Sequence, residues 1–362
     1  MQKYKKTAYL RKKTTTYLIS AFGAVSLGFS LSGCAGIVGS WNKNASSTEE
    51  QTEESAVVEY TCISNPESEK KIYVILKNYH GAYWKSVIEG ISDAAKEMDE
   101  AVYLGGIDNE TDISGQISLV NQAMEQGANG ILLAPANSSF LVESCEKAYA
   151  DEIPLVLIDS SINSTEYDAC YMTDNIAAGK MAAEEILEML NEAGNSPSEE
   201  LEVGILLSSD TSQAMVNRIS GFLDYWTNYA PEKWGIAQDI RINGGSVKKA
   251  QSDAEALLKE NEKIKGFFGC NNTSTVGIVN TLLAKKRSDV AMVGFDLADE
   301  TKEIIENPDY QAAALLQKQD QMGYLGMHML DSFIKGEKSQ QKYFDTGVTM
   351  IDQDYLMENE ES

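Results

Sequence analysis

From residue 71 onward, short apolar runs alternate with longer segments in which apolar residues recur every three or four positions. The run IYVIL at 72–76 predicts a buried strand, and the apolar stripe from Trp84 to Met98 predicts an amphipathic helix after it. Asp112 is a suitable N-cap for the next helix. The same pattern predicts further strands at 102–104, 131–134, 155–158, 203–207, 266–269 and 291–295, and helices at 180–190, 213–225, 246–261 and 274–284.

Strands that are apolar throughout and alternate with helices indicate parallel sheets covered on both faces. The rhythm runs twice, so the predicted fold class is α/β, with two doubly wound lobes. Ligands of such sheets bind beyond the carboxyl ends of the strands. The residues that directly follow each predicted strand are therefore the candidates for chemistry.

These positions hold carboxylates, a guanidinium group, amides and aromatic rings, which together suit a polyhydroxylated ligand. Carboxylates and amides accept hydrogen bonds from hydroxyl groups, Arg donates to ring oxygens, and aromatic faces pack on the apolar face of a sugar ring. The candidates are Lys77, Tyr83, Trp84, Asn137, Ser138, Asp159, Ser160, Arg218, Asn271, Asp296 and Gln317.

Each candidate has a structural alternative. Tyr83 and Trp84 are adjacent, so on a helix they point about 100° apart, and we expect one in the core and one in the cleft. The two aspartates could cap helices, and Asn271 could be a turn residue. Arg218 could belong to a surface ion pair and Lys77 to a solvated strand end. For Asn137 and Ser138, the start of a helix is preferred over ligand contact.

The N-terminal segment has the features of a bacterial lipoprotein signal peptide. Six Lys or Arg residues precede an apolar stretch from Tyr17 to Leu31, which is too short for a comfortable membrane span. Leu31-Ser32-Gly33-Cys34 then predicts cleavage after residue 33 and lipid attachment at Cys34; the alternative is a transmembrane anchor. Residues 34–69 are predicted as a flexible acidic tether, because they contain few large apolar side chains.

Composition excludes several function classes. The formal net charge is −25, and the basic residues of the signal peptide make the rest of the chain more negative still, which argues against nucleic acid as a partner. Two histidines, and cysteines without C-x-x-C spacing, argue against a metal site, and no cofactor motif is present. Spacing does not decide whether Cys62, Cys145, Cys170 or Cys270 form disulfides. No P-loop, GxSxG or HExxH motif is present.

Between about residues 71 and 350 the chain resembles the type I periplasmic binding proteins, the ribose-type sugar-binding proteins of ABC importers. The resemblance rests on motifs that occur in the family's order and with similar spacing. They are HGAYWKSVIEG, GILLAPANS, IPLVLIDSS, MTDNIAAGKMAAE, NRISGF, FGCNN, MVGFD and LLQKQDQMGYLG.

The resemblance implies a ligand cleft between two lobes joined by three hinge crossings, near residues 173, 317 and 346. Lobe 1 would comprise 70–173 and 318–346, and lobe 2 would comprise 174–317 and 347–362. Ser160 stands where ribose binders usually have Arg, Pro135 replaces a common Asn, and Gly245 lies near a position that is often aromatic. The implied ligand residues are Lys77, Tyr83, Trp84, Asp159, Ser160, Arg218, Asn271, Asp296 and Gln317.

The implied function is that of a lipid-anchored, extracytoplasmic protein that captures a monosaccharide or polyol by hinge closure and delivers it to an ABC permease. We expect a monomer held at the outer face of the cytoplasmic membrane by its lipid alone. The alternative is a sensor that presents its closed form to a kinase or chemoreceptor. An enzyme, such as a glycosidase using Asp159 and Asp296, is disfavoured, and so is a transcription regulator. The identity of the sugar is left open.

Overall fold

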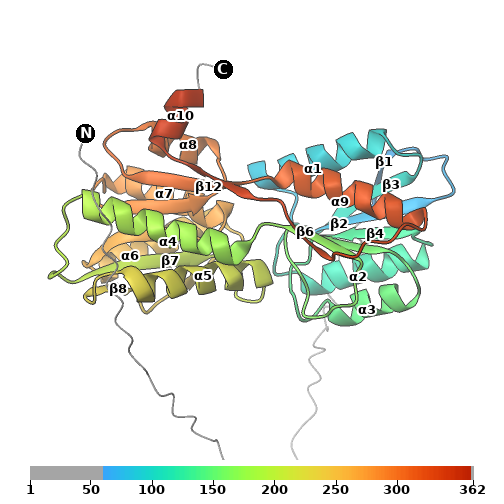
Figure 1. Ribbon diagram of the computed structural model, residues 1–362, viewed down its shortest axis with the longest axis horizontal. Coiled ribbons are helices and arrows are strands. Elements are labelled where there is room, and N and C mark those ends of the chain that lie inside the picture. The colour runs from blue at the N-terminus through green and yellow to red at the C-terminus, as the bar shows by residue number, and fades with distance from the viewer. Residues whose placement is uncertain (1–59, 360–362) are drawn as a thin grey trace, which may run out of the picture. The chain divides into compact units, whose positions relative to one another are not determined.

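The computed structural model describes residues 60–359 (Figure 1). Cys34, the predicted signal peptide and most of the predicted tether lie outside this range. The described chain forms two α/β lobes, each built on its own sheet. Parallel pairing predominates in both sheets, which confirms the predicted fold class.

In the described residues, lobe 1 has a seven-stranded sheet in the order β1-β3-β2-β4-β5-β6-β13. Only β1 runs antiparallel to its neighbour. Helices α1 (Gly81–Lys96) and α9 (Gln319–Ile334) cover one face, and α2 (Ile113–Glu125) and α3 (Val142–Ala150) cover the other (Figure 1). The strands are β1 (Thr61–Ser64), β2 (Lys71–Leu76), β3 (Ala101–Gly106), β4 (Gly130–Leu133), β5 (Leu155–Ile158), β6 (Ala169–Met172) and β13 (Tyr343–Asp345).

Lobe 2 repeats this plan with the strand order β14-β12-β11-β10-β7-β8, and β9 also pairs with β7. One face packs against α4 (Asn175–Glu192) and α5 (Gln213–Tyr229). The other packs against α6 (Val247–Glu260), α7 (Asn272–Lys285) and α8 (Asp299–Glu306), while α10 (Gln353–Asn359) ends the described chain. The strands are β7 (Leu201–Leu207), β8 (Trp234–Ile236), β9 (Arg241–Ile242), β10 (Ile264–Gly269), β11 (Ala291–Phe295), β12 (Ala312–Gln317) and β14 (Val348–Ile351).

The predicted tether extends too far into the chain. Strand β1 lies inside the range 34–69 and pairs antiparallel with β3, with Thr61 opposite Leu104. The Tyr60 hydroxyl donates to the Leu119 carbonyl at 2.8 Å, which ties the same segment to α2. An edge strand draws its stability from backbone hydrogen bonds on one side, so it needs little apolar surface of its own, and the polar composition concealed it.

The chain passes between the two sheets at 173–174, at 318 and at 346–347. Hydrogen bonds join these crossings to one another. The Thr173 hydroxyl donates to Gln317 Oε1 at 3.0 Å, and the Asp174 N–H donates to Asp345 Oδ1 at 2.9 Å. Gly347 has φ +81°, a conformation that favours glycine. The three crossings therefore lie close together.

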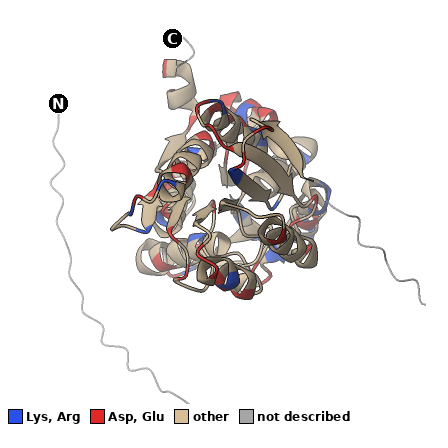
Figure 2. Cartoon of the chain, turned by 90° about the vertical axis from the view of Figure 1, so that its right-hand side faces the viewer, with Lys and Arg blue, Asp and Glu red and all other residues tan. Residues whose placement is uncertain are grey.

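Surface charge, the membrane-spanning potential of the helices and cysteine pairing do not change this description of the fold. Acidic positions are spread over the outer helices and loops with basic ones between them, so they form no single patch in this view (Figure 2). Within residues 60–359, no helix has the length and apolarity needed to span a membrane. The four cysteines of this range are all free thiols, and three of them are buried.

Candidate functional site

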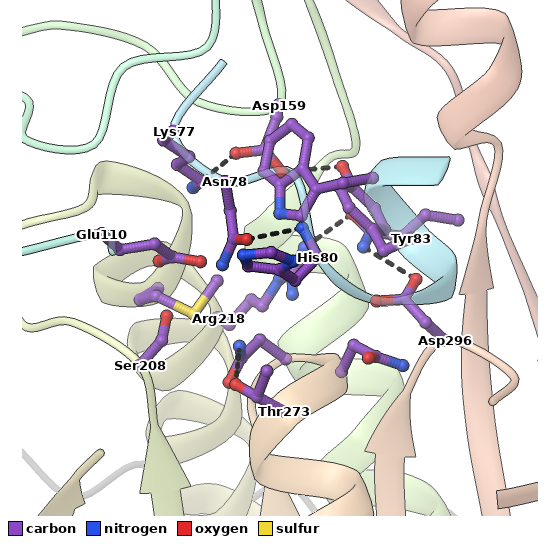
Figure 3. A pocket seen from close by; sticks show the side chains of 15 residues that line it. Lys77, Asn78, His80, Tyr83, Glu110, Asp159, Ser208, Arg218, Thr273 and Asp296 are labelled. Carbon is purple, nitrogen blue, oxygen red and sulfur yellow. Dashed lines mark hydrogen bonds and ion pairs between the residues drawn. The ribbon is translucent and has the colours of Figure 1, made fainter. Parts of the chain in front are cut away.

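A cavity with an empty volume of about 440 Å³ lies between the lobes, at the carboxyl ends of the strands of both sheets (Figure 3). Lobe 1 supplies side chains from the segments after β2, β3 and β5. Lobe 2 supplies them from α5, from the last residue of β12 and from the segments after β7, β10 and β11. They are Lys77, Asn78, His80, Tyr83, Trp84, Glu110, Asp159, Ser208, Met215, Arg218, Asn271, Asn272, Thr273, Asp296 and Gln317.

Eight of the nine implied ligand residues line this cavity, and Ser160 does not. Ser160 is fully buried beside it, and its hydroxyl accepts a hydrogen bond from the Ala214 N–H of lobe 2 at 3.3 Å. The structure thus brings together Lys77, Tyr83, Trp84, Asp159, Arg218, Asn271, Asp296 and Gln317.

Lys77 and Asp159 form a buried ion pair on lobe 1. Lys77 Nζ lies 2.6 Å from Asp159 Oδ2, and the Tyr83 hydroxyl donates to Asp159 Oδ1 at 2.7 Å. Lys77 is only 4% exposed, so the interpretation as a solvated strand end is wrong. Burial alone would lower the pKa of Lys77, but the charges of Asp159 and Glu110 more than offset this, and the net pKa is raised. The ammonium therefore stays charged inside the cavity.

Arg218 is buried in lobe 2 and is not part of a surface pair. Its Nε donates to Asn175 Oδ1 at 2.7 Å, Nη1 to the Cys270 carbonyl at 2.6 Å and Nη2 to Gln317 Oε1 at 2.6 Å. The guanidinium carbon lies 3.6 Å from the centroid of the Phe295 ring. A guanidinium group has five N–H donors, so these bonds hold it rigidly and leave two donors for a ligand.

Asp159 and Asp296 occupy equivalent places after β5 and β11. Both have a left-handed backbone, with φ of +67° and +66°. Backbone strain of this kind in non-glycine residues is typical of functional sites. Asp296 Oδ1 accepts from Gln317 Nε2 at 3.1 Å, and burial raises the pKa of Asp296 to about 6 against the opposing charge of Arg218. Helix α8 begins after Ala298, without a side-chain cap, so Asp296 is not its capping residue.

Both members of the aromatic pair border the cavity, although their helical spacing predicts one of them in the core. Tyr83 and Trp84 are 6% and 5% exposed, and their rings meet edge to face with centroids 5.0 Å apart. Lys77 Nζ lies 5.8 Å from the centroid of the Trp84 ring. Trp84 thus offers the cavity an apolar surface beside a fixed charge.

Sequence reasoning missed seven lining residues. The most informative is Glu110, in the loop after β3, because a strand is predicted there and inspection of the loop at its carboxyl end would have found it. The turn interpretation of Asn271 is consistent with its bonds to Ser274 and Thr273 at the start of α7, although Asn271 also lines the cavity. The others missed are Asn78, His80, Ser208, Met215, Asn272 and Thr273.

Beside the cavity, serine hydroxyls of lobe 1 cap helix α5 of lobe 2. The first amides of α5 have no cap from their own N-cap residue, Ser212. Instead, the Gln213 N–H donates to Ser138 Oγ at 2.9 Å and the Ala214 N–H donates to Ser160 Oγ. The Ser138 N–H also donates to the Thr211 carbonyl at 3.1 Å. Asn137 accepts from the Ser139 and Phe140 N–H groups in a turn that precedes α3, whose N-cap is Leu141.

The arrangement suits binding of a small polar molecule. Both lobes supply charged groups and hydrogen-bonding groups, and lobe 1 adds the aromatic faces. Across residues 60–359, no cluster of three or more His, Cys, Asp or Glu side chains could hold a metal ion. The side chains are largely held by one another, so the site is preformed for a ligand.

Proteins of similar sequence are also described as binding proteins for small molecules. The chain is 28% identical over 289 residues to a D-apiose import binding protein of Actinobacillus succinogenes, covering 79% of this chain and 86% of that protein. It is 25% identical over 289 residues to the ribose import binding protein of Escherichia coli, covering 78% and 91%.

Solved structures agree with the observed fold. A carbohydrate transporter solute binding protein from Agrobacterium radiobacter, in complex with D-arabinose, matches with a TM-score of 0.75 and 26% identity, covering 81% of this chain and 97% of that one. An ABC transporter solute binding protein from Agrobacterium vitis with bound D-fucose matches with a TM-score of 0.74 and 26% identity, covering 80% and 98%. The model of the periplasmic binding protein domain matches residues 72–338. This chain therefore belongs to the periplasmic binding protein domain family, as its motifs indicated.

Proposed function

We propose that this protein captures a monosaccharide or related polyol between its lobes and delivers it to an ABC importer, without chemical change. The observation that carries the proposal is the cavity itself. Arg218 and Asp296 of lobe 2 and Trp84 and Asp159 of lobe 1 all line one preformed space. Buried polar groups of this kind reject ligands that leave them unpaired, so the site is suited to select one sugar.

The relatives support the class of ligand and the importer as partner. Those compared above are described as import binding proteins for D-apiose and ribose, and the solved structures hold D-arabinose and D-fucose. These names favour import over sensing. The cavity is complete within one chain, which is why we propose a monomer.

Thermal unfolding of the full chain against a panel of pentoses, hexoses and polyols tests the proposal. A ligand present at about 1,000 times its Kd stabilises the folded state by about 4 kcal/mol, which raises Tm by several degrees. We expect a shift with a small subset of the sugars. If no sugar shifts Tm in protein shown to be folded, the proposed ligand class is wrong.

We further propose that the protein is exported and held at the outer face of the cytoplasmic membrane by a lipid on Cys34. The basic and apolar segments before Leu31-Ser32-Gly33-Cys34 support this. Replacement of Cys34 by Ser should abolish incorporation of labelled fatty acid and move the protein from the detergent phase to the aqueous phase in detergent partitioning. Replacement of Cys62, which is an exposed free thiol, is the matched control. Fatty-acid labelling that survives in Cys34→Ser would contradict the anchor.

Because the protein is proposed to capture its sugar by closing the two lobes, the serine caps of α5 should contribute to its affinity for the sugar. Their hydrogen bonds join the lobes, so they stabilise only the closed form. Ser138→Ala and Ser160→Ala should each weaken binding about threefold to tenfold, because one hydrogen bond contributes about 0.5–1.5 kcal/mol. Titration calorimetry measures this. Ser139→Ala is the control, since its hydroxyl bonds only to Asn163 of its own lobe; equal losses in all three variants would refute a role in closure.

A further inference from the structure

The cavity carries more buried negative than positive charge. Within the described chain, its lining supplies three buried carboxylates, Glu110, Asp159 and Asp296, and two buried cations, Lys77 and Arg218. His80 lies at the rim with its side chain 72% exposed, where water screens it. Buried charges are costly unless each has a partner, so the imbalance calls for an explanation.

Glu110 is the carboxylate without a cation of its own. The ammonium of Lys77 is paired with Asp159 at 2.6 Å. Arg218 faces Asp296, whose pKa its charge lowers against the effect of burial. Burial raises the pKa of Glu110, although the charge of Lys77 and the neutral side chains of Ser208 and Asn78 oppose this. Among the described residues, Asp159 thus has an ion pair and Asp296 faces Arg218, whereas Glu110 has no ion pair, and a cation brought close to it would stabilise its charged form.

Glu110 of lobe 1 lies opposite the backbone of Gly245 of lobe 2. A Cβ atom added to Gly245 of lobe 2 would lie 3.5 Å from Glu110 Oε1. Gly245 lies near the position where the resemblance leads one to expect an aromatic ring, and the Glu110 side chain packs against it instead. In Figure 3, Glu110 enters the cavity from the side opposite Asp296. The Glu110 carboxylate therefore borders the cavity from lobe 1, at van der Waals distance from the Cβ position of Gly245 on lobe 2.

We infer that Glu110 is a specificity-determining residue and that the ligand is an amino sugar or amino polyol, whose ammonium group pairs with the Glu110 carboxylate. This inference rests on the proposed function and narrows its ligand class. An ammonium in the cavity balances the third carboxylate and donates charge-assisted hydrogen bonds to it. A sugar acid or sugar phosphate would add to the surplus of negative charge and is excluded for the same reason.

Titration of the full chain at neutral pH with matched sugars tests the inference. The probes are D-glucosamine with D-glucose, N-acetyl-D-glucosamine and D-glucuronate, and the corresponding D-galactose set. In at least one set, the amine should bind about tenfold to a hundredfold more tightly than its neutral parent, in line with a charge-assisted hydrogen bond. The N-acetyl form keeps the substituent but lacks the charge, and it should not share this gain.

The variant Glu110→Gln removes the charge and keeps the shape. It should erase the preference for the amine, measured as the ratio of the Kd of the neutral parent to the Kd of the amine. Glu125→Gln, at an exposed position on α2, is the control and should retain the preference. If neutral sugars bind and the amines bind no better, or if Glu110→Gln retains the preference, the inference is overturned while sugar binding stands. If no sugar of any kind binds, the proposed function fails with it.

Discussion

Arg218→Ala is expected to abolish measurable ligand binding and to destabilise lobe 2. The substitution leaves the buried acceptors on Asn175 and Cys270 without their donor and removes the cation that faces Asp296. Loss of one partner from a buried charged network costs about 3–5 kcal/mol of the free energy of unfolding. The loss of affinity should be at least about a hundredfold. Chemical denaturation and titration calorimetry measure the two effects.

A second variant of Arg218 and a surface control separate the effect of its charge from that of its hydrogen-bond donors. Arg218→Lys keeps the charge but not the fork of donors, so stability should recover in part while affinity stays low. Arg287→Ala removes an arginine at the surface of lobe 2 that pairs with Asp289, and it should change stability by about 1 kcal/mol or less without affecting binding. Binding by Arg218→Ala at wild-type affinity would remove Arg218 from the site.

The second large effect concerns the Lys77–Asp159 pair. Lys77→Met and Asp159→Asn should each cost about 3–5 kcal/mol of the free energy of unfolding, because each leaves an uncompensated charge in the cavity. The double variant should be more stable than the sum of the single effects predicts, by about 1–3 kcal/mol. Ligand binding should be lost in all three variants. Urea denaturation without ligand gives the coupling energy.

An exposed ion pair provides the control for this double-mutant cycle. The Lys263–Glu200 pair of lobe 2 is as close as the buried pair, with 2.6 Å between Nζ and Oε2, but its side chains are 51% and 61% exposed. Its coupling energy should be much smaller than that of the buried pair, since water screens exposed pairs. Equal coupling energies in the two cycles would contradict the importance of burial for Lys77 and Asp159.

The sequence was sufficient for the architecture because parallel strands buried on both faces are apolar throughout. Runs such as IYVIL and AMVGF, and Asp112 as an N-cap, coincide with the observed β2, β11 and α2. Strand β1 was missed because an edge strand depends on a partner far along the chain. Its alignment with β3 is set by backbone pairing, and no local pattern marks it.

The part of the site that lies at the carboxyl ends of strands could be predicted from the sequence. Asp159, Asn271 and Asp296 follow buried strands directly, and the structure places them in one cavity. Ser160 is an exception to this rule. Its neighbour Asp159 lines the cavity, whereas the Ser160 hydroxyl bonds to α5 of the other lobe. Which of two adjacent side chains faces the ligand depends on the left-handed backbone at Asp159, and local sequence does not encode that turn.

A crystal structure of the chain, grown with the sugar that gives the largest thermal shift, is the most direct test of sugar capture between the lobes. We predict one sugar in the cavity, with Arg218 and Asp296 bonded to its hydroxyl or ring oxygens and Trp84 packed against its ring. The same density shows whether Glu110 meets an amino group. A sugar bound elsewhere on the chain, with this cavity unchanged, would contradict the central claim.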